Sequence, residues 1–136
     1  MRIYLFDFDN TIVTLPYEET IDYLDQKESL NPNLNFTPIV KTKNDYIKYC
    51  NYDPDGLFLL LSNRIMKVKK PLMTLLNKFG YNFEDYYLIN SEDRNKGNRV
   101  KKILNKYPDC THIKYWEDKV FKNFWSLLLS VLLRIK

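Results

Sequence analysis

The clearest pattern along the chain is a series of short apolar runs separated by segments with helical spacing. Residues 57–61 read LFLLL, a continuous apolar run typical of a strand buried on both faces of a parallel sheet. Runs rich in β-branched and aromatic residues predict three more strands, at residues 2–6, 86–90 and 112–116. Strands separated by helices in this way indicate a three-layer α/β fold with a central parallel sheet, and we expect residues 1–136 to form one domain.

Between these strands, apolar residues recur three and four positions apart, as they do on the inward face of a helix. One predicted helix has Pro71 in its first turn and ends at Gly80, and another covers residues 99–106. Their inward faces consist of Leu72, Leu75, Leu76 and Phe79 in the first helix, and of Val100, Ile103 and Leu104 in the second. Shorter helices are predicted near residues 17–26 and after Asn44.

Turn-forming sequences mark the breaks between these elements. The sequence NPNLN at residues 31–35, the sequence DPDG at residues 53–56 and the polar stretch at residues 91–98 all predict loops. The polar residues SNR, at 62–64, are expected to close the strand at 57–61.

Side chains that can carry chemistry come at the ends of three of the predicted strands. Asp7 and Asp9 follow the first strand, Ser62 closes the second, and Asp118 follows the last. Because the carboxyl ends of parallel strands meet at one edge of the sheet, we expect these side chains to lie close together.

The run DFDNT, at residues 7–11, is the strongest chemical signal. Successive side chains of a strand alternate in direction, so Asp7 and Asp9 start on the same side, and Asn10 tolerates the tight turn that follows. Two close carboxylates repel unless a cation lies between them, which suits a Mg²⁺ site where one carboxylate can attack phosphorus. The alternative is that these acids only cap the next helix or turn.

Composition and charge favour a globular, intracellular protein. The chain is 45% hydrophobic and 28% charged, which is enough apolar surface for a core. Its net charge of +4 is uneven, because acidic residues prevail in residues 1–61 and basic residues in 62–136. Cys50 and Cys110 lack metal-ligand spacing and are expected to be free thiols in a reducing compartment. The first residues read as a strand and not as a signal peptide, so a cytoplasmic location is expected.

Four ordered motifs together resemble those of the haloacid dehalogenase superfamily of phosphohydrolases. The DFDNT run at 7–11 resembles the first motif, LSNR at 61–64 the second, Lys96 ahead of a helix the third, and WED at 116–118 the acidic fourth. The resemblance spans nearly the whole chain. It implies a Rossmann-like fold with a minimal cap or none, in which residues 12–56 could form a small flap.

The same resemblance implies a Mg²⁺-dependent phosphatase that works through an aspartyl-phosphate. Asp7 would be the nucleophile, and Asp9 would act as general acid and then as general base. Ser62 would donate its hydroxyl to the phosphoryl group, and Lys96 would balance the negative charge. The implied metal site consists of Asp7, Asp9, Asp118 and Glu117. The implied substrate contacts are Thr11, Asn63 and Arg64.

Several of these residues have a second interpretation. Ser62 could simply cap the following helix, and Lys101 or Lys102 could take the place of the third-motif lysine. Glu117 could only orient a neighbour or pair with a lysine. Arg64 could pair with an acid or reach a substrate phosphate.

The substrate class follows from a narrower resemblance. Residues 113–124, IKYWEDKVFKNF, look like a segment of the phosphatase-like domain of Swiss Army Knife RNA repair proteins, and are also similar to polynucleotide phosphatase domains. Lys119 and Phe121 replace an arginine and a histidine that are usual there. We therefore expect a phosphorylated substrate, in particular RNA or DNA ends or nucleotides. The alternatives are a non-catalytic binding protein with the same fold and a phosphatase of proteins or small metabolites.

Basic residues of the second half could meet the phosphates beside the scissile one, or could simply be solvated on helices. They include Arg64, Lys67, Lys69, Lys70, Arg99, Lys101 and Lys102. No run of the sequence forms an obvious stacking platform for single-stranded bases, although Tyr and Phe are plentiful.

The carboxyl-terminal residues 120–136 are strongly apolar. At this length they are too short to cross a bilayer, so no membrane span is expected. They are predicted to form either a buried helix that completes the fold or an exposed patch for a protein partner or a homodimer.

Overall fold

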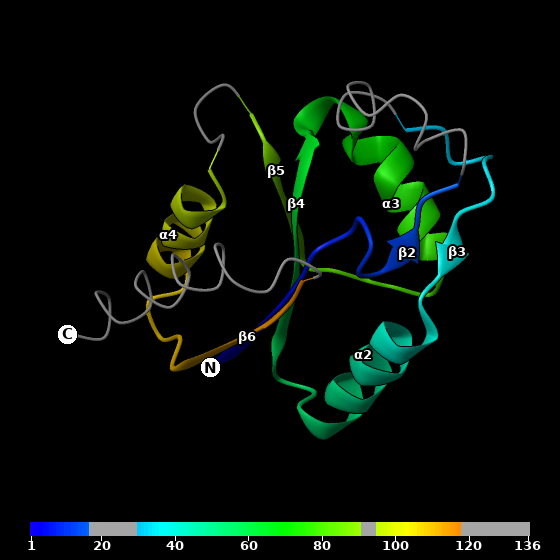
Figure 1. Ribbon diagram of the computed structural model, residues 1–136. Coiled ribbons are helices and arrows are strands. Elements are labelled where there is room, and N and C mark those ends of the chain that lie inside the picture. Colours follow the sequence, from blue (N-terminus) through cyan, green and yellow to red (C-terminus); the bar gives the residue numbers. More distant parts are fainter. Residues whose placement is uncertain (17–29, 91–94, 118–136) are drawn as a thin grey trace.

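The computed structural model describes residues 1–16, 30–90 and 95–117, and within them the chain forms an α/β fold around a four-stranded sheet (Figure 1). The strands are β1 (Arg2–Phe6), β4 (Leu57–Ile65), β5 (Asp85–Ile89) and β6 (His112–Trp116). They lie in the order β5-β4-β1-β6, and every pair is parallel. The predicted α/β class and the parallel central sheet are confirmed.

Helices cover both faces of this sheet. The helical elements are α2 (Val40–Tyr52), the 3₁₀ helix η1 (Met66–Val68), α3 (Lys69–Lys78) and α4 (Lys96–Lys106). Figure 1 shows α2 and α3 on one face of the sheet and α4 on the opposite face. A second, antiparallel sheet pairs β2 (Val13–Thr14) with β3 (Thr37–Pro38). The segment predicted as a flap therefore contributes β2 and β3, and also α2, which packs on the main sheet.

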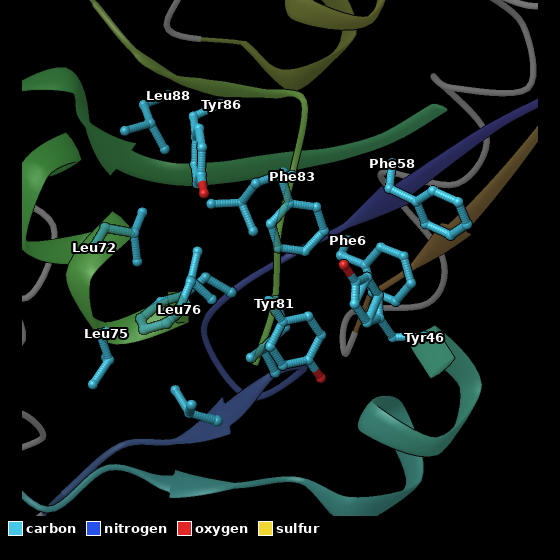
Figure 2. Close-up of a cluster of buried hydrophobic side chains, with 14 of the residues drawn as sticks. Phe6, Tyr46, Phe58, Leu72, Leu75, Leu76, Tyr81, Phe83, Tyr86 and Leu88 are labelled. Carbon is cyan, nitrogen blue, oxygen red and sulfur yellow. The ribbon is translucent and has the colours of Figure 1, made fainter. Parts of the chain in front are cut away.

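The two faces bury different kinds of side chain. Under α2 and α3 the core is rich in aromatic rings, several of which are visible in Figure 2. Phe6 of β1 stacks on Trp116 of β6 with 4.3 Å between ring centroids, and Tyr46 of α2 meets the edge of Phe6 at 5.7 Å. Under α4 the fully buried residues are aliphatic: Ile3, Leu5, Leu59, Leu61, Val100, Ile103 and Leu104. Burying each such side chain contributes about 1.5–3 kcal/mol, so both helix layers are held firmly to the sheet.

Two sharp turns behave as the sequence predicts. Asn10 has a φ of 57°, in the left-handed region that Asn tolerates, and its N–H donates to the carbonyl of Val13 at 2.8 Å. Gly80 has a φ of 80° and ends α3, as expected for a glycine after a helix. The chain therefore turns back directly after Asp9.

Four predicted boundaries are wrong, and the smallest error is in the strand predicted at 86–90, which is β5 at Asp85–Ile89. The strand at 57–61 continues to Ile65, because the polar residues after Leu61 stay in extended backbone and pairing with β5 resumes at Ile65 after a shift of register. The helix after Asn44 begins earlier, at Val40. Its first turn faces the core only through the polar Thr42, and its core-packed rings, Tyr46 and Tyr49, come later. The helix at 99–106 begins at Lys96, so the polar loop before it is shorter.

Two further predictions, the helix near residues 17–26 and the apolar segment at 120–136, lie outside the described residues. Cys50 and Cys110 are both free and partly buried. Of the helices in the described parts of the chain, none has the length and apolar character needed to cross a membrane.

Candidate active site

The buried polar and charged side chains of the described residues gather at one end of the molecule. They are Asp7, Thr11, Thr42, Ser62, Arg64, Lys96 and Arg99. They come from the segments that follow β1, from the end of β4 and from the first turns of α2 and α4. This is the carboxyl edge of the parallel sheet, where the sequence predicts the site.

Asp7 occupies the centre of this edge because β1 lies between β4 and β6. Its N–H donates to the carbonyl of Trp116 at 3.0 Å, so the residue is anchored to the end of β6. One carboxylate oxygen, Oδ1, accepts the N–H of Phe8 at 2.8 Å. The same oxygen lies 3.4 Å from Nζ of Lys96, and only 6% of the residue is exposed.

Lys96 connects three elements of the site. It is the first residue of α4, directly after Asn95, whose side-chain Oδ1 caps the helix by accepting the N–H of Gly97 at 2.6 Å. Besides Asp7, its Nζ contacts Oε1 of Glu117 at 3.1 Å and the hydroxyl of Tyr115 at 2.9 Å.

The alternative lysines, Lys101 and Lys102, are exposed further along α4. Lys96 is therefore the lysine that the structure brings to Asp7. Glu117, for which pairing with a lysine was one of two interpretations, pairs with Lys96.

Electrostatics make Asp7 unusual. Burial is the main cause that raises its pKa, to about 7, and Lys96 opposes the rise. The neighbouring carboxylates of Asp9 and Glu117 raise the pKa of Asp7 as well, while the hydrogen bond from Phe8 lowers it. Burial thus outweighs the stabilisation that Lys96 gives to the ionised form of Asp7.

Asp9 is held by a two-pronged ion pair. The guanidinium of Arg64 donates from its second terminal nitrogen to Oδ1 of Asp9 at 2.7 Å, and from Nε to both carboxylate oxygens at 3.2 Å. Arg64 is fully buried and lies 5.5 Å from the ring of Phe8. Of the two interpretations of Arg64, the structure shows pairing with an acid.

Ser62 and Asn63 are ordered by their neighbours on β4 and α4. The Ser62 hydroxyl oxygen accepts the N–H of Arg64 at 3.1 Å, and α3 begins only at Lys69, so Ser62 does not cap that helix. Arg99 donates to the carbonyl of Ser62 at 3.2 Å and to Oδ1 of Asn63 at 2.7 Å.

Two members of the predicted basic surface are therefore not on the surface. Arg64 and Arg99 are 0% and 1% exposed. Their charge is used inside the site, because each side chain holds a neighbouring group in place. They cannot act as a surface for distant phosphates.

A pocket of about 260 Å³ opens beside this cluster. Its walls include Thr11, Lys41, Thr42, Asp45, Trp116 and Glu117. The Thr11 hydroxyl is buried and has no hydrogen-bond partner within the described residues. Asp45 accepts the indole N–H of Trp116 at 3.1 Å. The pocket thus adjoins the glutamate that pairs with Lys96, and one of its lining residues, Thr11, has a buried hydroxyl without a partner among the described residues.

Three of the four predicted metal ligands lie in the described residues. Asp7, Asp9 and Glu117 provide carboxylate oxygens, the ligands that Mg²⁺ prefers, although Asp9 is paired with Arg64 and Glu117 with Lys96. Within residues 1–16, 30–90 and 95–117, no group of three acidic, His or Cys side chains is arranged to hold a metal ion. Asp118, the remaining predicted ligand, lies outside the described residues.

Three contributors were missed by reasoning from the sequence alone. Arg99 lies three residues after Lys96, a spacing that puts both on one face of α4 and could have signalled a shared role. Tyr115 precedes Glu117 by two positions. Side chains two residues apart on a strand point the same way, so this spacing could have suggested that Tyr115 faces the site together with Glu117. The pairing of Trp116 with Asp45 has no local signal, because it joins residues far apart in the chain.

Comparison with known proteins gives no relative from which to transfer a role. Neither a protein-family model nor a curated protein matches the chain.

Proposed function

We propose that this protein is a Mg²⁺-dependent phosphomonoester hydrolase of the haloacid dehalogenase type, acting through an aspartyl-phosphate on Asp7. One observation carries the proposal: a buried aspartate, paired with a buried lysine, sits at the carboxyl edge of a parallel sheet with a second aspartate two residues on. Burying ionised groups lowers stability unless they are well paired, so such a cluster is more readily explained by chemistry than by folding.

In the first step, an Asp7 carboxylate oxygen attacks the phosphorus of a phosphate monoester. A bond forms between that oxygen and phosphorus as the bond from phosphorus to the leaving oxygen breaks. Asp9 gives its proton to the leaving oxygen, which departs as an alcohol.

In the second step, a water molecule attacks the phosphorus of the aspartyl-phosphate. Asp9 takes a proton from that water, inorganic phosphate leaves, and the carboxylate of Asp7 is regenerated.

The remaining residues are proposed to orient and to balance charge. Lys96 offsets negative charge on Asp7 and the phosphoryl group as a compact cation. Ser62 and Thr11 have hydroxyls suited to phosphoryl oxygens, and the Thr11 hydroxyl is the one with no partner among the described residues. Arg64 is a positioning residue for Asp9, which replaces its predicted role in contacting substrate.

Asp7, the backbone carbonyl of Asp9 and Asp118 would hold Mg²⁺, with Glu117 beside them. When bound, the ion would supply positive charge that eases the approach of one anion to another. The substrate class we propose is a phosphorylated nucleic-acid end or a nucleotide, supported by the motif resemblance.

The direct test is a phosphate-release screen in buffer with Mg²⁺. The panel contains an aryl phosphate, mononucleotides, a sugar phosphate and oligonucleotides phosphorylated at the 3′ or the 5′ end. Release from the aryl phosphate or from any oligonucleotide, abolished by Asp7→Asn, supports the proposal. No release from any member of the panel would favour the alternative, a non-catalytic binding protein.

A further inference from the structure

A second hollow, of about 470 Å³, lies toward the opposite end of the sheet from Asp7. One wall is the last turns of α2, with Tyr49 and Tyr52, and the other is the first half of β6, with His112 and Lys114. Arg2 and Tyr4 of β1 also line it. We call this hollow the α2–β6 groove.

Aromatic rings give the groove flat faces. The Tyr52 side chain is exposed to 68%, and its ring lies perpendicular to that of Tyr49 at 6.4 Å between centroids. Tyr49 in turn lies 5.4 Å from Tyr4 and 5.4 Å from Trp116. No sequence pattern marks this cluster, because the fold collects these rings from three separate elements.

Cations accompany the rings. Nζ of Lys114 donates to the hydroxyl of Tyr49 at 2.7 Å and lies 4.6 Å from the centroid of that ring. Arg2 lines the same hollow as the exposed ring of Tyr52, and a hydrogen bond with that tyrosine is the main cause that raises the pKa of Arg2. None of the described residues that line the groove carries a carboxylate.

The groove points toward the candidate active site. On β6 the side chains of His112, Lys114 and Trp116 share the face that α2 covers, since strand residues two apart point the same way. Trp116 is a wall of the pocket beside Glu117, and Lys114 lies 5.4 Å from its ring. From His112 to Trp116 the strand rises roughly 13 Å, so the two hollows are consecutive along one edge.

We infer that the α2–β6 groove binds single-stranded nucleic acid, with a base stacked on the exposed ring of Tyr52 and phosphates paired with Arg2 and Lys114. Exposed aromatic faces beside cations are the combination by which proteins bind single strands without sequence preference. A strand lying along β6 would bring its phosphorylated end to the pocket beside Glu117. This inference deepens the proposed function, and depends on it only for what happens to that end.

A peptide is the other macromolecule that such a groove could take. The absence of carboxylates among the described lining residues, and the two cations Arg2 and Lys114 beside the exposed ring of Tyr52, favour a polyanion that carries flat rings. An acidic peptide would use the cations but would leave Tyr52 without a stacking partner.

The test measures binding of an unphosphorylated, fluorescein-labelled oligothymidylate of about ten nucleotides by fluorescence anisotropy. This probe has no terminal phosphate to hydrolyse, so the measurement does not depend on catalysis. The variants are Tyr52→Ala and Lys114→Gln. Their controls are Ile47→Ala, an exposed residue of the same helix outside the groove, and Lys78→Gln, an exposed lysine at the end of α3. Circular dichroism checks that each variant is folded.

The expected result is that Tyr52→Ala raises Kd about tenfold. Lys114→Gln should also weaken binding and lower the slope of log Kd against log salt by about 0.7, the share of one phosphate contact. Both controls should match the wild type. Absence of binding by the wild type, or equal losses in groove and control variants, would overturn the inference, and the first result would point to a peptide.

Release of phosphate from an aryl phosphate by the wild type, measured in parallel, separates the two proposals. Groove-dependent binding with no phosphate release from the aryl phosphate or from any other member of the substrate panel supports the groove and refutes the phosphatase. The opposite outcome is phosphate release together with an oligonucleotide Kd that is unchanged in Tyr52→Ala and Lys114→Gln. It supports the phosphatase and overturns the groove.

Discussion

The two ends of the sheet treat charge in opposite ways. At the carboxyl edge, Asp7, Arg64 and Lys96 are almost completely buried and are held by one another or by neighbouring groups. At the other end, Arg2 and Lys114 are exposed beside tyrosine rings. Exposed charges are inexpensive and are easily exchanged, whereas buried ion pairs carry a desolvation penalty that folding alone does not require. The contrast agrees with the two proposals made above, chemistry at the first end and reversible binding at the second.

The strongest way to break this contrast is to remove the carboxylate at the centre of the buried cluster. Asp7→Asn keeps the size of the side chain but replaces the nucleophile by an amide, so phosphate release should fall by on the order of a thousandfold or more. Thermal unfolding should show a folded protein. The matched control, Asp85→Asn, alters a partly exposed aspartate at the amino end of β5 and should keep full activity. Turnover by Asp7→Asn within a few-fold of the wild type would remove Asp7 from its role.

The next effect concerns the cation that the carboxylates are proposed to hold. Chelation of Mg²⁺ should stop phosphate release, and Asp118→Ala should lower it by roughly a hundredfold or more at saturating substrate. Adding Mg²⁺ should also raise the Tm of the wild type, because the ion binds the folded form. Full activity after exhaustive chelation would contradict the proposed site.

A lysine pair sharpens the comparison between buried and exposed charge within one helix. Lys96→Gln removes the cation that contacts Asp7 and Glu117, and kcat should fall about a hundredfold, as for loss of one preorganised charge in an active site. Lys101→Gln, an exposed position in α4, should match the wild type. Steady-state kinetics of both variants decide the point, since similar losses would mean that the buried position has no special role.

The smallest of these effects is expected at Arg64. Arg64→Lys keeps a positive charge but cannot donate to both carboxylate oxygens of Asp9, so kcat should fall about tenfold with little change in KM. Tm should fall by roughly 5 °C, because a single ammonium group cannot replace all the hydrogen bonds of the guanidinium and leaves part of a buried ion pair unsatisfied. A large rise in KM at constant kcat would instead restore the interpretation that Arg64 binds the substrate.

The sequence predicted the framework well because the framework depends on local patterns. Continuous apolar runs marked the strands, and β6 was predicted with its observed bounds. Apolar residues at helical spacing marked the buried faces of α3 and α4. Helix α2 was placed too late because its first turn is polar and the rings that pack on the core, Tyr46 and Tyr49, lie in its second half.

The sequence predicted those site residues that directly follow strands. It did not predict the side-chain contacts between residues of distant elements. Asp7 and Lys96 could be paired in advance through motif resemblance. The contacts of Arg64 with Asp9 and of Arg99 with Asn63 could not be predicted. Nothing in a sequence distinguishes a buried arginine from an exposed one. Burial of these two arginines is a property of the packing between β4, α4 and the turn after β1.

The central claim is that Asp7 is the group that accepts the phosphoryl group, and the most direct measurement is to capture it. The wild type is mixed with an aryl phosphate and Mg²⁺ and quenched within milliseconds in acid, which preserves an acyl phosphate, and its peptides are then weighed by mass spectrometry. The account predicts one added phosphoryl group on the peptide that contains Asp7, and none in Asp7→Asn. Phosphate release with that peptide unmodified throughout the reaction would contradict it.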